Sequence, residues 1–150
     1  HDALPICKEE LLDEIVSSLI AEIKVEAEQA MDSSLPFSEN VHRALYRILE
    51  FRQRHQLTAK LLQEMRSIGT IAVQEVLTKF DRAMVEFIRQ KIEAAVEKGE
   101  IRPCNAEITA FLMLKMYIAL IVDWEKDHQP LTKEQIAELF ALYFLQGLSK

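Results

Sequence analysis

Two short acid–histidine steps are the residues of this sequence that come nearest to a catalytic pattern. Glu39 precedes His42 by three positions, and Glu125 precedes His128 by the same spacing. In helical di-iron bundles, such a step on each of two helices binds the metals together with a glutamate from each of two others. Both steps here lie at the expected ends of helices, whereas metal ligands must project from mid-helix into a shared core. A role at the helix surface is therefore favoured over a metal site.

Other enzyme signatures are missing from the sequence. It contains no glycine-rich phosphate loop, no G-x-S-x-G motif and no Cys/His pattern that would activate a nucleophile. Cys7 and Cys104 are isolated, without CxxC or zinc-ligand spacing, and no signal peptide precedes them. We therefore expect no enzyme activity, no cofactor and no metal, with both thiols reduced in the cytoplasm.

A set of aromatic and methionine side chains suggests a different chemistry, the binding of a small apolar molecule. Methionine is flexible and suits surfaces that adapt to varied ligands. His55 and Tyr117 add isolated polar groups that could orient a bound molecule, although each position also fits an ordinary core, where polar groups hydrogen-bond internally. The pocket is expected between the second helix and the long one. The predicted ligand-binding residues are Phe51, His55, Met65, Phe80, Met84, Phe87, Phe111 and Tyr117.

Composition indicates that long helices must position these residues. The 150-residue chain is 49% hydrophobic, yet it has only 3 glycines and 4 prolines, and its mean hydropathy is −0.01. Apolar and charged residues must therefore alternate along uninterrupted elements, and the length suits one domain. The formal net charge of −6 disfavours contact with the phosphates of nucleic acid and with anionic lipid.

The apolar periodicity predicts six helices. They span residues 8–31, 38–53, 57–66, 70–98, 106–127 and 132–148. Asn105 is expected to cap the fifth helix, and Thr132 with Gln135 forms a capping box at the start of the sixth. From Ile108 to Trp124 the fifth helix is apolar around its whole circumference, yet its internal Lys115 and Asp123 make it a poor membrane span.

The last two predicted helices each carry two apolar faces, more than one core of this size can cover. Part of that surface should therefore meet a second copy of the chain. Periodicity leaves open which face of each helix meets the partner. The candidate interface residues are Ile118, Ile121, Phe140, Tyr143, Phe144 and Gly147.

The order of these elements resembles the C-terminal regulatory domain of the TetR/AcrR family of bacterial repressors. Lys8-Glu9-Glu10-Leu11-Leu12 resembles the start of the helix that follows the family's DNA-binding domain. Gly99-Glu100-Ile101-Arg102-Pro103 resembles the turn before its first dimerisation helix. Leu131-Thr132-Lys133-Glu134-Gln135-Ile136 and Gln146-Gly147-Leu148 resemble the two ends of its last helix. Each motif alone is of low specificity, but their order and spacing together are fairly specific.

The resemblance implies an all-α antiparallel bundle of about six helices over residues 8–150, whose last two helices form a four-helix interface in a homodimer. It implies a domain that senses a small hydrophobic effector and thereby alters the spacing of DNA-binding domains in the intact cytoplasmic regulator. Residues 1–7 do not supply the family's helix-turn-helix domain, so they are expected to be disordered or vector-derived, and DNA would be reached only through a missing domain. Two alternatives stay open, a helical protein-interaction module without a ligand and, least favoured, a ferritin-like metal-binding bundle.

Overall fold

The computed structural model describes residues 8–67 and 69–150, and these residues form helices joined by short turns. Within those ranges no strand is present, which confirms the expected all-α bundle. The helices are α1 (Lys8–Ala30), α2 (Phe37–Leu49), α3 (Arg52–Arg66), α4 (Ile71–Glu97), α5 (Ala106–Ile118), α6 (Lys133–Phe140) and α7 (Gln146–Leu148). Three short segments continue α5 and α6, namely the π-helical η1 (Ala119–Asp123) and η3 (Ala141–Leu145) and the 3-10 turn η2 (Trp124–Lys126).

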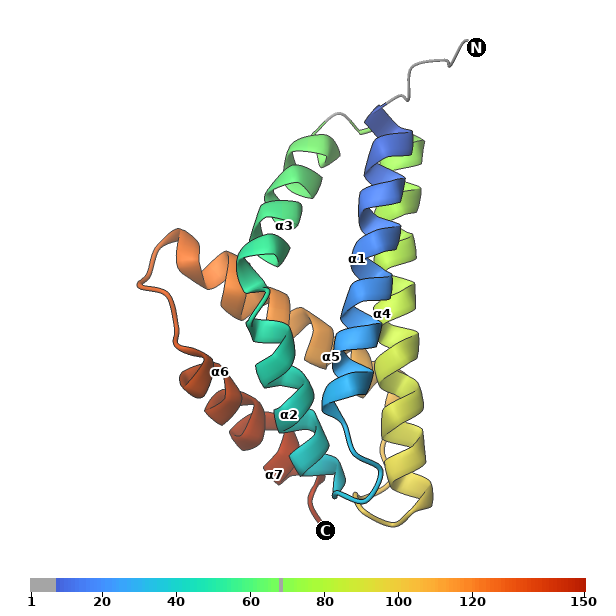
Figure 1. The fold of residues 1–150 in the computed structure, drawn as a ribbon, viewed down its shortest axis with the longest axis vertical. Helices are drawn as coiled ribbons and strands as arrows, with labels where there is room; N and C mark the ends of the chain where they lie inside the picture. Colours follow the sequence, from blue (N-terminus) through green and yellow to red (C-terminus); the bar gives the residue numbers. More distant parts are fainter. Residues whose placement is uncertain (1–7, 68) are drawn as a thin grey trace.

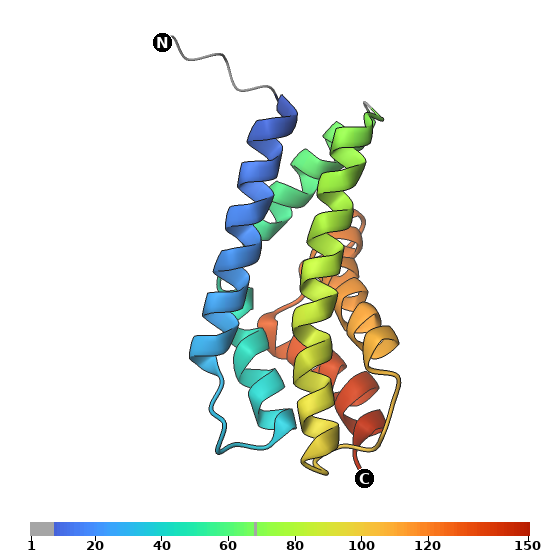
Figure 2. The same cartoon turned by 90° about the vertical axis from the view of Figure 1, so that its right-hand side faces the viewer.

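Two long helices form the spine of the molecule. α1 and α4 lie side by side along its longest axis, and α2 and α5 pack against them (Figure 1). The view from the side shows α5 beside α4, with α6 and α7 close to the end of the bundle where the chain stops (Figure 2). α2 and α3 follow one another on the same side of the spine as the end of α5 and α6 (Figure 1). α3 contacts both α4 and η1, so it joins the spine to the last helices.

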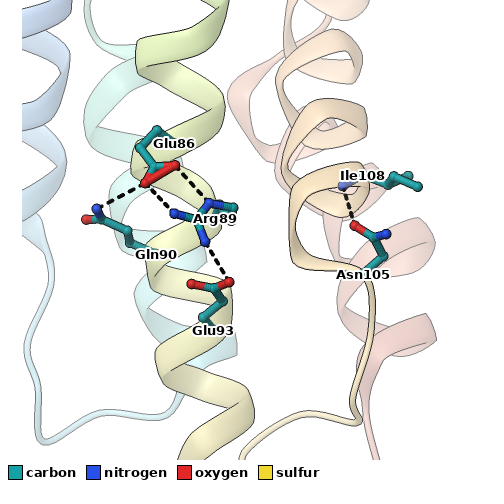
Figure 3. Close-up of polar contacts among 6 residues, drawn as sticks. All are labelled: Glu86, Arg89, Gln90, Glu93, Asn105 and Ile108. Carbon is teal, nitrogen blue, oxygen red and sulfur yellow. Dashed lines mark hydrogen bonds and ion pairs between the residues drawn. The ribbon is translucent and has the colours of Figure 1, made fainter.

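Local sequence signals fix several helix ends where they were expected. The Thr132 hydroxyl accepts the Gln135 amide at 3.1 Å and the Gln135 side chain accepts the Thr132 amide at 2.9 Å, which confirms the capping box. Figure 3 shows the Asn105 side chain accepting the Ile108 amide, at 3.0 Å, to begin α5. At the end of α4, Gly99 adopts φ +72, the left-handed conformation that closes a helix without steric cost to glycine.

The solvent face of α4 carries an ion-pair cluster. Figure 3 shows Arg89 between Glu86, one turn earlier, and Glu93, one turn later. The hydrogen bonds from Arg89 lower the pKa of the Glu86 carboxyl. Because both carboxylates are exposed, such pairs support the helix only weakly.

The predicted boundary between the second and third helices is wrong by several residues. The second helix ends at Leu49 instead of continuing to Gln53, and α3 begins at Arg52 instead of at Leu57. Phe51 lies between them at φ −106 and ψ 15, outside the helical region. Residues 50–57 contain neither glycine nor proline, so no local residue type marks this turn.

The last two predicted helices are also less regular than expected. Each widens into one π-helical turn, at 119–123 and at 141–145, instead of running as a single α-helix. π turns are rare and occur mostly as single-turn interruptions of α-helices, often at functional sites. Apolar periodicity does not reveal them here, because the surrounding residues are apolar on every side.

The buried side chains form two clusters, one toward each end of α4. The larger one joins α2, the C-terminal half of α4, α5 and α6, and Ile92, Ile121 and Ile136 are among its fully enclosed members. The smaller one joins α1 to the N-terminal half of α4 through Leu12, Val16 and neighbouring residues. Leu114 of α5 belongs to this second cluster, so α5 packs into both.

Three further expectations concern the ends and surfaces of the chain. Residues 1–7, including Cys7, lie outside the described residues. Cys104 is a free thiol. In the described part of the chain, no helix is both long and apolar enough to cross a bilayer.

Candidate ligand-binding cavity

A cavity of about 970 Å³, partly open to solvent, lies between the helices of the bundle, with walls from α1–α5 and η1. This volume is at the upper end of the range that encloses drug-sized ligands. Most of its lining side chains are apolar. The deepest apolar contributors include Leu19, Ala27, Leu45, Met84, Met113, Leu114 and Ile121, each less than a tenth exposed.

Five of the eight residues predicted to bind ligand line this cavity. They come from α3, α4 and α5, and the fold brings them together from positions up to 62 residues apart. They are His55, Phe80, Met84, Phe87 and Tyr117.

The other three lie elsewhere. Phe51, in the turn before α3, borders a separate small hollow beside Glu22 and Ile48 that is too small to admit a water molecule. Met65 is buried in the cluster between α1 and α4 without lining the cavity. Phe111 is on the outer face of α5 and 45% exposed. All three are large apolar residues on, or directly next to, helices that reach the cavity, so residue type could not separate them from the five that line it.

The predicted set missed the walls formed by the first two helices. α1 contributes Leu19, Ile23 and Ala27, and α2 contributes Val41 and Ile48. A signal for them is present in the sequence, because the residues of each set are spaced four or seven positions apart, as on one apolar face of a helix. An apolar stripe, however, is the same whether it faces a filled core or an open cavity.

A single hydrogen-bonded pair supplies the deep polar feature of the cavity. The Nδ1 atom of His55 lies 2.8 Å from the hydroxyl of Tyr117, and the two rings meet edge to face. Burial lowers the pKa of His55 to about 4, with Glu22 opposing and Arg54 assisting this shift. Burial also raises the pKa of Tyr117 well above its usual value. Both side chains are therefore neutral at physiological pH.

This buried histidine is expected to make the fold acid-sensitive. Its pKa is about 6.5 when unfolded and about 4 when folded, so the unfolded state binds the proton first. The contribution of His55 to the free energy of unfolding is fully present above pH 6.5. It falls by about 3 kcal/mol in total as the pH drops toward 4. Urea unfolding at steps between pH 7.5 and 4 measures this loss. A His55→Gln variant should flatten the dependence, whereas His42→Gln, at an exposed position of α2, should retain it; equal slopes in all three proteins would contradict the assignment.

Charged side chains are at the rim of the cavity, and four of them form two ion pairs. Lys91 of α4 pairs with Glu28 of α1, and Lys115 of α5 pairs with Asp81 of α4 at 3.2 Å. Each member of these pairs is more than a third exposed. The pairs therefore link neighbouring helices across the cavity edge, while the interior keeps no ionised group.

One glutamine connects α3 to the π-helical turn that follows α5. The side-chain amide of Gln56 donates to the backbone carbonyl of Ile121 and to the carboxylate of Glu125, both at 2.8 Å. Next to it on α3, Arg52 donates to the carbonyl of Leu131, before the last helix. The cavity wall formed by α3 is thus tied by hydrogen bonds to both of the last helical segments.

The two acid–histidine steps are used in other ways. Glu125 accepts from Gln56, and His128 stacks on Trp124 with ring centroids 3.6 Å apart. His42 is exposed and lies against Tyr46 within α2. Across residues 8–67 and 69–150, no three histidine, cysteine or acidic side chains come together as metal ligands.

The candidate interface residues are divided between the inside and the outside of the chain. Ile121 and Phe140 are buried at 2% and 4% exposure, so a partner cannot reach them, and Ile118 lines the cavity. Phe144 is half-buried against Phe140. Tyr143 and Gly147 are on the surface, and the outward face also exposes large side chains absent from the predicted set: Ile108, Phe111, Leu112 and Leu142.

The sequence of this chain is similar to a known family and to a curated protein. The family described as "Tetracyclin repressor-like, C-terminal domain" matches residues 34–148. A curated relative from Bacillus subtilis (strain 168), the "Uncharacterized HTH-type transcriptional regulator YhgD", is 58% identical over 142 residues, which are 95% of this chain and 74% of the relative. No solved structure matches the chain significantly.

Proposed function

This chain belongs to the TetR family of transcriptional regulators as a C-terminal domain, and from that premise we propose that it senses a small apolar effector and pairs with a second copy of itself. The cavity is the observation that carries the proposal. It encloses about 970 Å³ between α1 and α5 and is lined mostly by apolar side chains. A space of this size and lining favours burial of an apolar ligand.

Pairing of two chains is supported by the surface of the last helices. Six of the ten large hydrophobic side chains exposed in the described part of the chain lie between residues 106 and 148. Ile108, Phe111 and Leu112 occupy one side of α5, and Leu142 and Tyr143 lie on η3. A twofold contact uses each such side chain twice, which makes it an efficient way to cover this surface.

The proposed regulation runs from the cavity to the paired helices. A ligand shifts a conformational equilibrium only by its difference in affinity for the two states. In the intact regulator, an effector that prefers one packing of α3 against α5 would change the separation of two helix-turn-helix domains, whose spacing must match the DNA half-sites. The description of the B. subtilis relative as an HTH-type regulator supports such a domain, and we propose that the intact protein acts in the bacterial cytoplasm.

Filling the cavity tests the proposal. Nile red, a neutral dye whose emission rises on leaving water, is expected to bind once per chain. Met84 lines the cavity at 3% exposure, so Met84→Trp should reduce dye affinity at least tenfold through loss of space. Overpacking of about 1–3 kcal/mol is tolerable if circular dichroism shows the helices intact.

The matched control is Ile71→Trp on the same helix. Ile71 is 75% exposed and does not line the cavity, so this variant should bind the dye like the unmodified chain. Undiminished binding by a folded Met84→Trp variant would remove the cavity as the ligand site.

A further inference from the structure

The His55–Tyr117 pair keeps unused hydrogen-bonding capacity for a further group. If the tyrosine hydroxyl donates to Nδ1, the Nε2–H of His55 remains a free donor and the tyrosine oxygen a free acceptor. If Nδ1–H donates to the tyrosine, Nε2 becomes the acceptor and the hydroxyl the donor. With either tautomer, the pair at 2.8 Å offers one donor and one acceptor.

The second ring nitrogen of His55 is not sealed off from its surroundings. No described residue hydrogen-bonds Nε2 of His55, and no side-chain nitrogen or oxygen among the described residues is sealed off without a partner. The Nε2 atom therefore keeps accessible surface. Of the two hollows that His55 borders, the large cavity alone has room for a ligand atom.

Other interior polar groups of the wall are already satisfied. Thr58 donates its hydroxyl to the Arg54 carbonyl at 3.0 Å. The side-chain amide of Asn40 donates to the carbonyls of Asp32 and Leu35. Two other polar lining residues, Ser33 and Gln63, are exposed. The His55–Tyr117 pair is therefore the buried polar anchor that remains available to a ligand in the described part of the cavity.

Because His55 and Tyr117 are both neutral, the pair disfavours a ligand group that carries a charge. With its pKa lowered to about 4, His55 carries a proton in about one molecule in a thousand at pH 7. Four basic side chains line the cavity, and all are at its exposed rim: Lys91 and Lys115 pair with Glu28 and Asp81, while Arg66 and Lys98 are exposed to solvent. A carboxylate brought to the pair would be a buried charge without a counter-charge, which is strongly unfavourable.

We propose that the cavity selects a neutral, mainly apolar molecule with one hydroxyl or carbonyl oxygen, and that this oxygen hydrogen-bonds to the His55–Tyr117 pair. This inference deepens the proposed effector-sensing function and depends on it. It restricts the ligand class to phenols, alcohols, ketones and similar neutral compounds. It excludes free fatty acids and other carboxylates from the anchor.

Three probes of matched size test this selection by competition with Nile red at pH 7.5. They are 4-propylphenol, propylbenzene and 4-propylbenzoate. The phenol is expected to bind about fivefold more tightly than propylbenzene, the value of one net hydrogen bond. The benzoate is expected to bind at least a hundredfold more weakly than the phenol.

Two variants distinguish a hydrogen bond to the His55–Tyr117 pair from binding by burial of apolar surface alone. Tyr117→Phe should reduce the preference for the phenol over propylbenzene to less than twofold. Tyr143→Phe removes a hydroxyl from a side chain that is 65% exposed, so it should keep the fivefold preference. The comparison of probes on the unmodified chain decides the question even if Tyr117→Phe does not fold.

The outcomes distinguish the inference from the function on which it rests. If Nile red binds but the benzoate competes best, or the phenol has no advantage, the neutral-anchor inference is wrong and effector sensing stands. Dye binding without competition from any probe also overturns the inference alone. If neither dye nor probes bind, both proposals fail.

Discussion

Replacing Leu112 by glutamate is expected to convert a dimer of this domain into monomers. Leu112 is 49% exposed on the outer face of α5, within the surface proposed to pair with a second chain. Twofold symmetry places two such carboxylates in one interface, and each costs several kcal/mol if it stays dry. Since about 1.4 kcal/mol is tenfold in affinity, the dissociation constant should rise by roughly a thousandfold or more.

Sedimentation velocity at tens of micromolar measures this change directly. The matched control is Leu57→Glu on α3, where the side chain is 69% exposed and outside the last helices. That variant should remain a dimer. Phe144→Glu is a poorer probe, because Phe144 packs against the core and its loss also destabilises the chain. A monomeric unmodified chain, or a dimeric Leu112→Glu variant, would show that this surface serves another purpose.

Truncating Ile92 to alanine is expected to cause a large loss of stability. Ile92 has no exposed surface and belongs to the core cluster that joins α4 to α2, α5 and α6. It does not line the cavity, so its neighbours are close-packed and the deletion leaves a void. Removing a buried isoleucine side chain in this way costs about 2–5 kcal/mol. For a chain of this length the melting temperature should fall by about 10 °C.

Ile71→Ala is the control for this prediction. It makes the same chemical change on the same helix at a residue that is 75% exposed, and it should alter stability by less than about 0.5 kcal/mol. Both proteins must be unfolded at one concentration, because association stabilises the folded state by mass action. Similar losses for the two variants would contradict the burial of Ile92, because even a core that relaxes fully loses the transfer free energy of the deleted atoms.

Helix ends with a local chemical cause were predictable from sequence. Thr132 with Gln135, Asn105 and Gly99 each act within a few residues of their own position, so the chain does not need to be folded for their effect to be foreseen. The turn at Phe51 has no such cause. Beside that turn, Arg52 donates a hydrogen bond to the carbonyl of Leu131, which is 79 positions later in the chain. A local sequence pattern does not reveal tertiary contacts of this kind.

The sequence predicted which types of residue line the candidate site, but not which way each side chain faces. Met84 and Tyr117 were identified because methionine and tyrosine are typical of adaptable, partly polar ligand sites. Phe111 has the same chemistry and points outward. On a helix that is apolar all round, such as α5, only packing decides which side faces a cavity, a core or a partner. The same ambiguity placed Ile121 and Phe140 among the interface candidates, although both are in the core.

The π-helical turns at Ala119–Asp123 and Ala141–Leu145 have a consequence for how this sequence tolerates insertions and deletions. A π turn holds about one residue more than an α turn, so each segment is equivalent to a helix with one inserted residue. Losing one residue there would restore an ordinary α turn while leaving both flanking stretches in register. Losing one residue elsewhere in α5 would rotate everything beyond it by about 100°, turning Ile121 out of the core and bringing exposed side chains in. Gaps of one residue between family members should therefore collect within these two segments.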